Sequence, residues 1–428
     1  LFLAEQQMVS PVADMDMNSF HSYRPPVERP KNKKVAVIGA GPAGLSGAYF
    51  LTCKGYKVTV FEALPVAGGM LAVGIPDYRL PKGVLNTEIK MITDLGVEIR
   101  YNTAIGKDIT IDKLIKDGYE AILMATGAHK GQKLGIPGED AKGVVDGVTF
   151  LRSLNLKETI KTAGRVAVIG GGNVAIDAAR SALRLGADEV FILYRREKED
   201  MPAYAEEIEE AEKEGVTIHT LVAPKQVIVK RGKVTGIECV RMSLGKFDKG
   251  GRRTPQPITG SEFVVNTDMI IAAIGQLPDL SYINGDGIKT GKGSTIEVDP
   301  KTLATTREGI FAAGDNVRGP ATAVEAVADG KNAALAIDRY LGGDGLPMNA
   351  FYEELVKMPV TYNESIYQQE RPRMEMPHLA ISKRYKNFNE VVLGYQQKMA
   401  IEEARRCLHC HLREEEEEIA AEEEQQEG

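Results

Sequence analysis

The chain has 428 residues and a formal net charge of -7, with 43 % hydrophobic and 26 % charged residues, a composition that suits two or three globular domains. Nine of its glutamates lie in residues 414–428, so the remainder is close to neutral and lacks the basic footprint of a nucleic-acid-binding protein. No apolar run reaches the roughly 18 residues of a transmembrane helix, and no signal peptide is recognisable at the amino terminus. The chain has only four cysteines, which favours a reducing, cytoplasmic setting over a disulfide framework.

Residues 1–33 are predicted to form an extended arm or linker, because they contain four prolines and little periodicity. An alternating strand and helix pattern follows. A strand is predicted over residues 34–38, a small-residue helix over about 42–53 and a second strand over 57–61. Short β-branched runs of this kind are typical of strands that are buried on both faces of a parallel sheet.

Gly39, Gly41 and Gly44 form a G-x-G-x-x-G turn between the first strand and its helix. The first glycine permits the tight turn, the second lets a pyrophosphate approach the backbone, and the third lets helix and strand pack closely. The amino terminus of the helix offers free N–H groups to the phosphates. Glu62 ends the next strand, where a carboxylate accepts hydrogen bonds from an adenosine ribose. The combination predicts a dinucleotide site.

An apolar but turn-rich stretch follows at residues 68–81. A flavin ring needs a flat apolar wall with close backbone approach, and Gly69 beside Met70 and Leu71 would supply one. An ordinary hydrophobic loop is the alternative interpretation.

The same strand–helix–strand plan recurs with strands predicted at residues 165–169 and 189–194 and a helix over about 173–185. Gly170 and Gly172, followed by Ala175 at the packing position, give a G-x-G-x-x-A turn. Beyond this second unit, residues 227–230 and 233–241 flank an Arg-Gly pair, which predicts an antiparallel hairpin.

Arg195 and Arg196 stand where an NAD site would have Asp or Glu. Two guanidiniums suit a 2′-phosphate well and a bare ribose diol poorly. We therefore predict NADPH over NADH. Surface ion pairs of the two arginines with Glu197 or Glu199 are the alternative.

A third element is a strand from residue 310 that ends in Gly-Asp at Asp315, followed by a helix that opens near residues 320–323 and runs to about 341. Asp315 can accept a hydrogen bond from a ribitol hydroxyl. The helix start can stabilise negative charge on a reduced flavin near its N1 and O2 positions. Such a helix is not needed for NAD, so it favours FAD in the first unit.

Beyond residue 342 the chain becomes polar and rich in proline, tyrosine and methionine, and we expect it to dock or wrap. Cys407 and Cys410 lie there in C-x-x-C spacing. The pair is compatible with half of an iron–sulfur site, a zinc site with His409 or His411, a redox dithiol or, least favoured, a haem c attachment motif. Spacing alone does not choose, and a shared iron–sulfur cluster or zinc is the metal hypothesis.

Several local strings coincide with one family, and over about residues 34–341 the chain resembles the small (β) subunit of glutamate synthase and its relatives. These relatives include flavoprotein subunits of electron-bifurcating transhydrogenases and of some hydrogenase and formate dehydrogenase complexes, and the amino-terminal half of dihydropyrimidine dehydrogenase. The matching strings are VAVIGAGPAGL from Val35, GGMLAVGIPDYRLP from Gly68, ATGA from Ala125, VAVIGGGNVAIDAAR from Val166, YRREKEDMPA from Tyr194, AAIGQLPD from Ala272 and GIFAAGDNVRGPATAVEAVADG from Gly309.

The resemblance implies an α/β fold with two Rossmann-like domains, one for FAD and one for NADP, the second inserted into the first, and an extended C-terminal tail. The expected segments are an arm over 1–33, a first part of the FAD-binding domain over 34–145, an NAD(P)-binding domain over 146–277, a second FAD-binding part over 278–341 and a docking tail over 342–428.

The resemblance also implies site residues. FAD would be held along Gly39, Gly41, Gly44, Glu62, Gly69, Leu71, Asp315 and Thr322, and NADPH along Gly170, Gly172, Asn173, Arg195 and Arg196. Further cofactor contacts are expected from Pro42, Ala43, Ala63, Met70, Arg79, Thr126, Gly127, Val174, Ala175, Gly275, Gly314 and Ala323. Hydride transfer is carried by the cofactors, so no catalytic side chain is expected.

The function implied is an FAD-dependent NADPH oxidoreductase subunit that passes electrons to or from the iron–sulfur centres of a partner in a larger complex. The partner would be an iron–sulfur or hydrogenase/dehydrogenase-type subunit. The family's EAxRCLxC signature stands here at residues 403–410, and no glutaminase elements are present, which weakens any claim to glutamate synthesis. The alternatives are a free-standing NADPH–ferredoxin type reductase and a structural subunit that retains the fold without catalysis.

Overall fold

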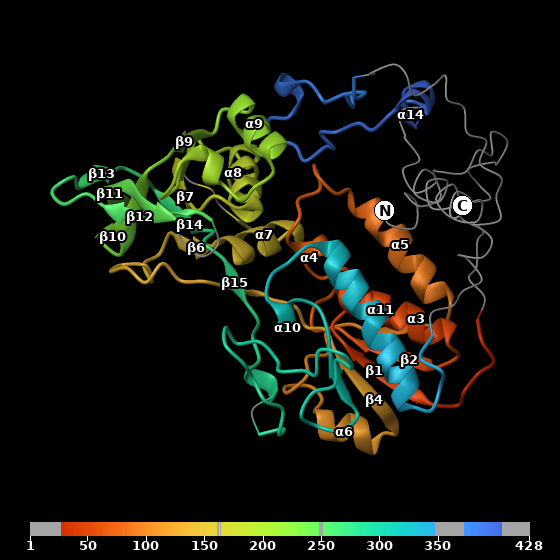
Figure 1. Cartoon of the computed structure of the whole chain (residues 1–428). Helices are drawn as coiled ribbons and strands as arrows, with labels where there is room; N and C mark the ends of the chain where they lie inside the picture. Colours follow the sequence, from red (N-terminus) through yellow and green to blue (C-terminus); the bar gives the residue numbers. More distant parts are fainter. Residues whose placement is uncertain are drawn as a thin grey trace, which may run out of the picture. The chain divides into compact units, whose positions relative to one another are not determined.

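The computed structural model describes residues 27–160, 162, 164–247, 251–283, 285–346 and 372–404. They separate into two compact units. Figure 1 labels their helices and strands. The larger unit holds the described residues up to 346 together with residues 380–390, and the smaller holds residues 372–379 and 391–404. The predicted pair Cys407 and Cys410, the acidic end and the first 26 residues lie outside the described residues.

The larger unit begins with a five-stranded parallel sheet in the order β16-β4-β1-β2-β3. Its strands come from both ends of the unit, because β16 follows the whole second sheet in sequence. The elements of this first domain are β1 (Lys34–Ile38), β2 (Lys57–Phe61), β3 (Glu98–Arg100), β4 (Tyr119–Met124), β16 (Ile310–Ala312), α3 (Pro42–Cys53), α4 (Met70–Val73), α5 (Lys82–Asp94), α6 (Ile111–Lys116), α10 (Asp315–Arg318) and α11 (Ala323–Tyr340).

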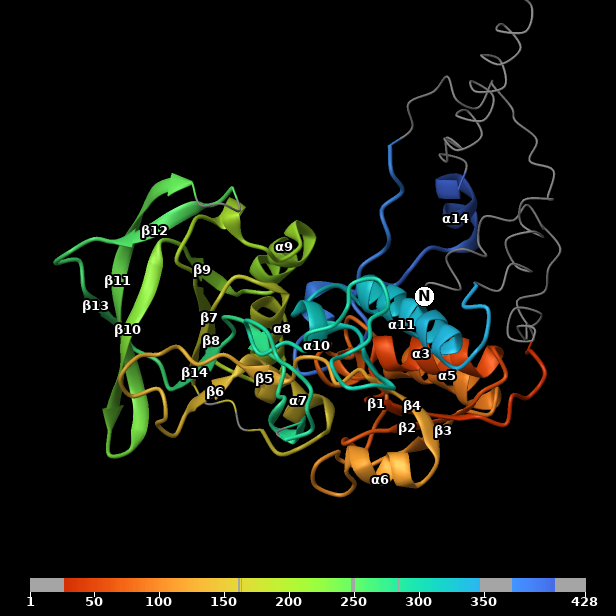
Figure 2. The same ribbon diagram turned by 60° about the horizontal axis from the view of Figure 1, so that its bottom comes forward.

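Both faces of this sheet are covered, as Figure 2 shows with α3, α5 and α11 on one side and α6 on the other. Alternate residues of β1 serve the two cores. Val35 and Val37 pack under α3 and α11, whereas Ala36 and Ile38 pack against the α6 side. Continuous burial along the strand is the reason that its sequence is a plain apolar run.

A second five-stranded parallel sheet has the order β6-β14-β7-β8-β9. Its elements are β6 (Val144–Asp146), α7 (Gly147–Asn155), β7 (Arg165–Ile169), α8 (Asn173–Arg184), β8 (Glu189–Leu193), α9 (Ala205–Lys213), β9 (Thr217–His219) and β14 (Met269–Ala272), with 3₁₀ turns at Lys198–Asp200, Ser281–Ile283 and Ile381–Lys383 along the unit. Helices α7, α8 and α9 cover one face.

An antiparallel flap covers the other face of the second sheet and replaces the usual helices there. It consists of β10 (Val222–Lys230), β11 (Lys233–Phe247), β12 (Arg253–Pro257) and β13 (Phe263–Val265). The predicted hairpin is therefore confirmed, and both of its strands are longer than expected. The flap's apolar side chains Val222, Val227 and Ile237 pack against Ala167 and Ile169 of β7.

Two short crossing strands connect the two domains. β5 (Lys130–Gly131) leaves the first domain and pairs antiparallel with β15 (Gln276–Leu277), which returns to it. The second domain is thus inserted into the first, as predicted. The crossing strands suggest an insertion over residues 132–275, and β6 belongs to the second sheet although the expected boundary stood at residue 145. The segment limits stay a prediction.

The smaller unit is described in two pieces that contact each other. Leu379 and Val391 share a backbone hydrogen bond of 2.8 Å, and His378 forms a β-bridge with Val392. α14 (Gln397–Ala404) brings Glu403 to the backbone N–H of Met374, at 2.8 Å. Among the helices that the structure describes, none combines the length and the apolar character that a bilayer crossing requires.

Candidate functional site

The first glycine turn lies between β1 and α3, and two of its positions leave no room for a side chain. Gly39 has φ of +101°, and a Cβ there would lie 2.4 Å from the carbonyl oxygen of Ala125, which follows β4. A Cβ on Gly44 would lie 1.9 Å from the carbonyl oxygen of Gly39. Glycine is therefore required at both positions, which agrees with their predicted roles in the tight turn and in packing helix against strand.

Gly41 differs because the space beside it is open. It is the N-cap of α3 and has an ordinary φ of -78°. A Cβ there would find no atom nearer than the Cα of Gly69, at 3.8 Å. A pyrophosphate can therefore come close to the free N–H groups at the start of α3, because glycine places no side chain in its way. We call the turn from Gly39 to Gly44 and the start of α3 the first cradle, and it fits a dinucleotide.

The stretch predicted as a flavin wall packs directly on this cradle. Gly68 donates its N–H to the carbonyl of Ala40 at 2.7 Å, and a Cβ on Gly69 would lie 2.7 Å from the Cα of Gly41. Met70 and Leu71 then begin α4 and contact the core of the first domain while remaining partly exposed. The wall and the phosphate cradle are therefore held in one fixed arrangement.

Glu62 lies beneath the turn at the end of β2. Its two carboxylate oxygens accept hydrogen bonds from the N–H groups of Ala40, at 2.7 Å, and Leu64, at 2.8 Å. Burial raises the pKa of Glu62, although these backbone donors oppose the shift. Each oxygen keeps a second lone pair, so the carboxylate fastens the turn and can still accept from a ribose hydroxyl.

Asp315 is brought to the same edge of the sheet by β16. It begins α10 after Gly314, whose Cβ position would lie 2.9 Å from the Cβ of Ala43 at the start of α3. Burial raises the pKa of Asp315 to about 6, against the effect of a hydrogen bond from the N–H of Ala321. Thr322 is the N-cap of α11, and its hydroxyl belongs to a capping box with Glu325. Asp315 therefore adjoins the first turn with a half-buried carboxylate, and Thr322 caps an exposed helix start one turn before Ala326, which packs with Ala43 and Ala125.

A polar cluster that the sequence motifs do not reveal adjoins the first turn. The hydroxyls of Thr126 and Tyr282 are 2.9 Å apart, and Asn316 is fully buried, donating to the carbonyl of Met124 at 3.0 Å. The buried carbonyl oxygen of the Asn316 side chain has no protein partner among the described residues. Of these residues only Thr126 had been predicted as a site residue. Tyr282 and Asn316 were missed because they lie more than 150 residues from Thr126 along the chain.

The second glycine turn repeats the geometry of the first. Gly170 has φ of +141°, and a Cβ there would lie 2.2 Å from the carbonyl oxygen of Ala273, which follows β14 as Ala125 follows β4. Gly172 is the N-cap of α8, and a Cβ there would find nothing nearer than Pro202, at 3.9 Å. The second glycine is again the open one, and this cradle also fits a dinucleotide.

The two arginines after β8 have different environments. Arg195 is exposed, and within the part of the chain that the structure describes its side chain makes no hydrogen bond or ion pair. Arg196 is only 6 % exposed and donates from Nε to the carbonyl oxygen of Arg253, at 2.9 Å. Glu197 pairs with the Arg253 guanidinium and not with either predicted arginine. Among the described residues Arg195 is thus available to a phosphate, whereas Arg196 supports the loop. Strand β12 of the flap adds a further basic residue, Arg253, which the sequence motifs had not indicated.

The remaining predicted residues fall into three groups. Most lie along the two turns or the loops beside them, namely Pro42, Ala43, Ala63, Gly127, Asn173, Val174, Gly275 and Ala323. Ala175 is completely buried in the core of the second domain, in keeping with a packing role. Arg79 points elsewhere, because its guanidinium contacts Asp177 of α8 and Glu207 of α9.

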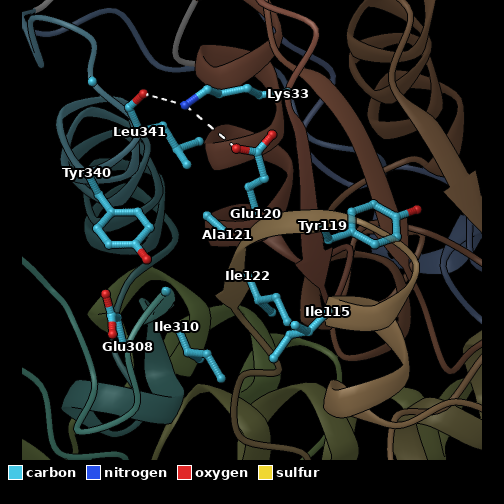
Figure 3. A pocket seen from close by; sticks show the side chains of 12 residues that line it. Lys33, Ile115, Tyr119, Glu120, Ala121, Ile122, Glu308, Ile310, Tyr340 and Leu341 are labelled. Carbon is cyan, nitrogen blue, oxygen red and sulfur yellow. Dashed lines mark hydrogen bonds and ion pairs between the residues drawn. The ribbon is translucent and has the colours of Figure 1, made fainter.

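A surface hollow of about 600 Å³ lies at the opposite edge of the first sheet (Figure 3). It is lined by Glu120 and Ile310 at the amino ends of β4 and β16 and by Tyr340 at the end of α11. Lys33 bridges the carbonyl of Leu341, at 2.8 Å, and the carboxylate of Glu120, at 3.6 Å. Ligands of open parallel sheets bind at the carboxyl ends of the strands, so this hollow is separate from the candidate site.

No group of three or more potential metal ligands occurs in the described residues. Cys53 and Cys239 are free and buried there, and burial raises the pKa of the Cys53 thiol to about 11. Neither has the exposed, low-pKa character of a redox-active cysteine.

Comparison with known proteins agrees with this geometry. Residues 33–330 match the family model described as pyridine nucleotide-disulphide oxidoreductase, and the chain belongs to that family. It is 50 % identical over 388 residues to the NADP(+)-dependent formate dehydrogenase subunit beta of Moorella thermoacetica, covering 89 % of this chain and 54 % of that one. It is 41 % identical to the NADPH-Fe(3+) oxidoreductase subunit beta of Geobacter sulfurreducens, covering 92 % and 64 %.

The resemblance found in the sequence motifs is confirmed. The small chain of glutamate synthase [NADPH] from Escherichia coli is 37 % identical over 325 residues, which cover 72 % of this chain and 69 % of that one. The structure of Mycobacterium tuberculosis FprA in complex with NADPH has the same fold, with a TM-score of 0.64 and 19 % identity, covering 78 % of this chain and 88 % of that one. The chain spans only about half to two thirds of the length of the Moorella and Geobacter subunits.

Proposed function

We propose that this chain is an FAD-dependent NADPH oxidoreductase subunit that passes electrons between NADP(H) and the iron–sulfur centres of a partner in a larger complex. The observation that carries the proposal is the pair of glycine turns at Gly41 and Gly172, each open at its second glycine and each at the start of a helix. Two dinucleotide cradles in one chain are what a flavin and a nicotinamide cofactor together require.

When both cofactors are bound, they supply hydride transfer between nicotinamide and flavin, and the protein positions them and excludes water. We assign FAD to the first cradle because Glu62, the wall that starts at Gly69, Asp315 and the amino terminus of α11 adjoin it. A helix amino terminus stabilises nearby negative charge, as on a reduced flavin. No catalytic side chain is required.

We assign NADPH to the second cradle, with Arg195 as the contact to the 2′-phosphate. Arg195 is exposed and has no partner within the described residues, so binding a phosphate breaks no existing ion pair. A charge-assisted hydrogen bond to a phosphate is worth roughly 1.5–3 kcal/mol. Arg196 contributes through the loop that it fastens to Arg253.

We infer the partner from the relatives of this chain. The Moorella and Geobacter proteins are called beta subunits, of a formate dehydrogenase and of an NADPH-Fe(3+) oxidoreductase. A chain at 50 % identity to one of them is expected to work beside further subunits that carry metal centres. A shared cluster or zinc at Cys407 and Cys410 and a cytoplasmic location belong to the same proposal.

Anaerobic reduction of the purified full chain tests the core of the proposal. The protein should carry FAD, and NADPH should bleach its flavin absorbance at least about tenfold faster than NADH at low concentrations, since one lost phosphate contact costs at least 1.4 kcal/mol. Replacing Arg195→Gln should remove most of that preference, while Arg231→Gln in the hairpin turn is the matched exposed control. Equal rates with both nucleotides in the wild type would refute the NADPH assignment.

The partner is tested with the full chain as bait in its native host. Captured proteins that hold iron–sulfur clusters and accept electrons from the NADPH-reduced chain support a complex. Efficient reduction of free ferredoxin without any stable partner would favour the free-standing reductase instead.

A further inference from the structure

A buried cluster of charged residues connects the flavin wall to the helix that begins at the second cradle. The chain leaves α4 and forms a loop over residues 74–81, whose Tyr78 is 1 % exposed. The Tyr78 hydroxyl lies 3.3 Å from a carboxylate oxygen of Asp177 on α8. The guanidiniums of Arg180 and Arg184, also on α8, lie 4.7 Å and 4.0 Å from the centre of its ring.

Arg79 extends the same contact with charge. One of its terminal nitrogens lies 3.1 Å and 2.9 Å from the two carboxylate oxygens of Asp177, and its Nε lies 3.2 Å from Glu207 of α9. The side chain of Asp177 is 6 % exposed and that of Arg79 is 20 % exposed. Removal from water makes such a pair stable only while both partners stay in place.

The cluster continues along α8 and α9 through further ion pairs. Glu214, at the end of α9, is held by Arg180, Arg184 and Arg384, and Arg384 also pairs with Glu210. The members are four arginines, Arg79, Arg180, Arg184 and Arg384, and four carboxylates, Asp177, Glu207, Glu210 and Glu214. Arg79 is the arginine supplied by the first domain, so withdrawing the loop would take from the buried Asp177 the guanidinium that pairs with it, and from Glu207 one of its two arginines.

These contacts connect the two cradles through a short series of neighbouring elements. On one side, Gly69 packs on Gly41 and begins α4, which runs into the loop that carries Arg79. On the other side, Asp177 lies in the second turn of α8, the helix that Gly172 caps. A further cross-domain bond, from the Asn155 side chain to the carbonyl of Val73 at 2.9 Å, fixes α4 against α7.

We propose that Tyr78, Arg79, Asp177 and Glu207 form an interdomain clamp that holds the nicotinamide cradle in register with the flavin wall, so that Arg79 and Asp177 are positioning residues for hydride transfer. The proposal rests on the proposed function. The crossing strands β5 and β15 attach the domains at one place and leave rotation about that place open. The clamp, together with the bond between Asn155 and Val73, attaches the domains at a second place and so restrains that rotation.

Loss of the clamp should act on the transfer step and not on binding. Neither cradle includes the guanidinium of Arg79, so affinity for each cofactor is retained. Hydride transfer needs reacting atoms about 3–3.5 Å apart, and a misplacement of about 1 Å costs on the order of a hundredfold. We therefore expect Arg79→Ala to lower the rate constant of flavin bleaching at saturating NADPH by tenfold or more, with an unchanged Kd for NADPH.

The experiment compares stopped-flow bleaching of the FAD-loaded full chain for wild type, Arg79→Ala, Arg79→Lys and Asp177→Asn. Arg79→Lys keeps the charge and should recover part of the lost rate. The matched control is Arg307→Ala. Its side chain is 23 % exposed and pairs with two carboxylates, Asp112 and Asp286, but all three residues belong to the first domain. FAD content, the Kd for NADPH and the thermal midpoint are measured for each variant.

A fall in the bleaching rate for Arg79→Ala, partial recovery in Arg79→Lys and no fall in Arg307→Ala support the clamp. An unchanged or faster rate in Arg79→Ala overturns it, since a clamp that must open before transfer would restrain the wild type. If Arg79→Ala does not retain FAD, the test uses Arg79→Lys and Asp177→Asn. Wild-type rate constants of flavin bleaching in both of these variants would overturn the proposal. A wild-type flavin that no nicotinamide reduces would refute the proposed function itself, which is a separate outcome.

Discussion

Glu214 is surrounded by arginines to a degree that its sequence context does not reveal. Its carboxylate accepts hydrogen bonds from Arg180, Arg184 and Arg384, and its side chain is 4 % exposed. Burial alone would raise its pKa, but the hydrogen bonds and charges of Arg184 and Arg180 outweigh burial and lower the pKa of Glu214 to about 2. The ionised carboxylate is thus a condition for the α8–α9 packing.

The pH dependence of stability follows from this shift. A carboxylate whose pKa is lower in the folded than in the unfolded state stabilises the fold above the unfolded value, near 4.5, and loses that contribution as the pH falls towards 2. A shift of the Glu214 pKa from 4.5 to about 2 corresponds to a contribution of roughly 3 kcal/mol to the free energy of unfolding, because one pKa unit is worth about 1.36 kcal/mol. Denaturant unfolding, followed by circular dichroism from pH 6 to pH 3, should show the gap between wild type and Glu214→Gln narrowing on acidification.

Glu212→Gln is the control for that series, because Glu212 forms an exposed pair with Lys198 at 2.6 Å. Exposed pairs contribute about 0–1 kcal/mol, so its curve should follow the wild type. A constant gap between wild type and Glu214→Gln at every pH would contradict the assignment.

At the scale of elements, the two helix starts at α3 and α8 depend on glycine for different reasons at each position. Gly39 and Gly44 are fixed by protein atoms, so replacing them perturbs the fold. A Cβ on Gly41 or Gly172 would meet no protein atom within 3.7 Å, so protein contacts do not require glycine there, whereas the approach of a phosphate to the backbone does. The open glycines therefore separate binding from folding experimentally.

We expect Gly41→Ala to fold and to lose most of its FAD, because the added methyl group occupies the approach of the pyrophosphate. Gly172→Ala should keep FAD and bind NADPH at least about tenfold more weakly, the cost of one displaced phosphate contact. FAD content by absorbance and NADPH affinity by titration measure the two effects.

Gly83→Ala is the matched control for both glycine variants. Gly83 lies exposed in α5 with no atom within 4 Å of its Cβ position, and alanine favours a helix by up to about 1 kcal/mol there. Full FAD content in Gly41→Ala would show that the first cradle does not hold the cofactor.

At the scale of the whole molecule, the insertion is defined by the paired strands β5 and β15. Gln132 donates its N–H to the carbonyl of Gly275 at 3.0 Å, so the chain enters and leaves the second domain at the same place. Between these points lie a complete sheet and its own core, with Val166, Val168 and Ile176 at its centre. The segment has what an independent domain needs.

We predict that residues 132–275 expressed alone fold cooperatively and bind NADPH without FAD. Calorimetric titration with NADPH measures binding, and the same fragment carrying Gly172→Ala provides the weakly binding control. A fragment with no cooperative unfolding transition would show that the first domain completes its core.

Much of the fold was predictable because the signals are local. The apolar runs at residues 34–38 and 165–169 gave strands with those bounds, and the glycine turns placed α3 and α8 to within a residue. Strand burial on two faces and helix starts after glycine are properties of neighbouring residues. Their repetition was enough to predict two parallel sheets and the order in which they occur.

The side-chain environments were not predictable in the same way. Arg79 was expected at a cofactor, but its contacts lie 98 residues away in α8, and the Thr126 hydroxyl meets one that is 156 residues away. Arg195 and Arg196 are equivalent in sequence and differ in the fold, because the carbonyl of Arg253 on the flap reaches only Arg196.

The sequence by itself determined the two phosphate-binding turns and the alternation of strand and helix, since both depend on residues that are close along the chain. Only the tertiary structure decided which charges meet across the domains, which of two adjacent arginines donates to the flap and where the second domain is attached. Those outcomes depend on desolvation and on contacts between segments that come together only when both sheets have formed.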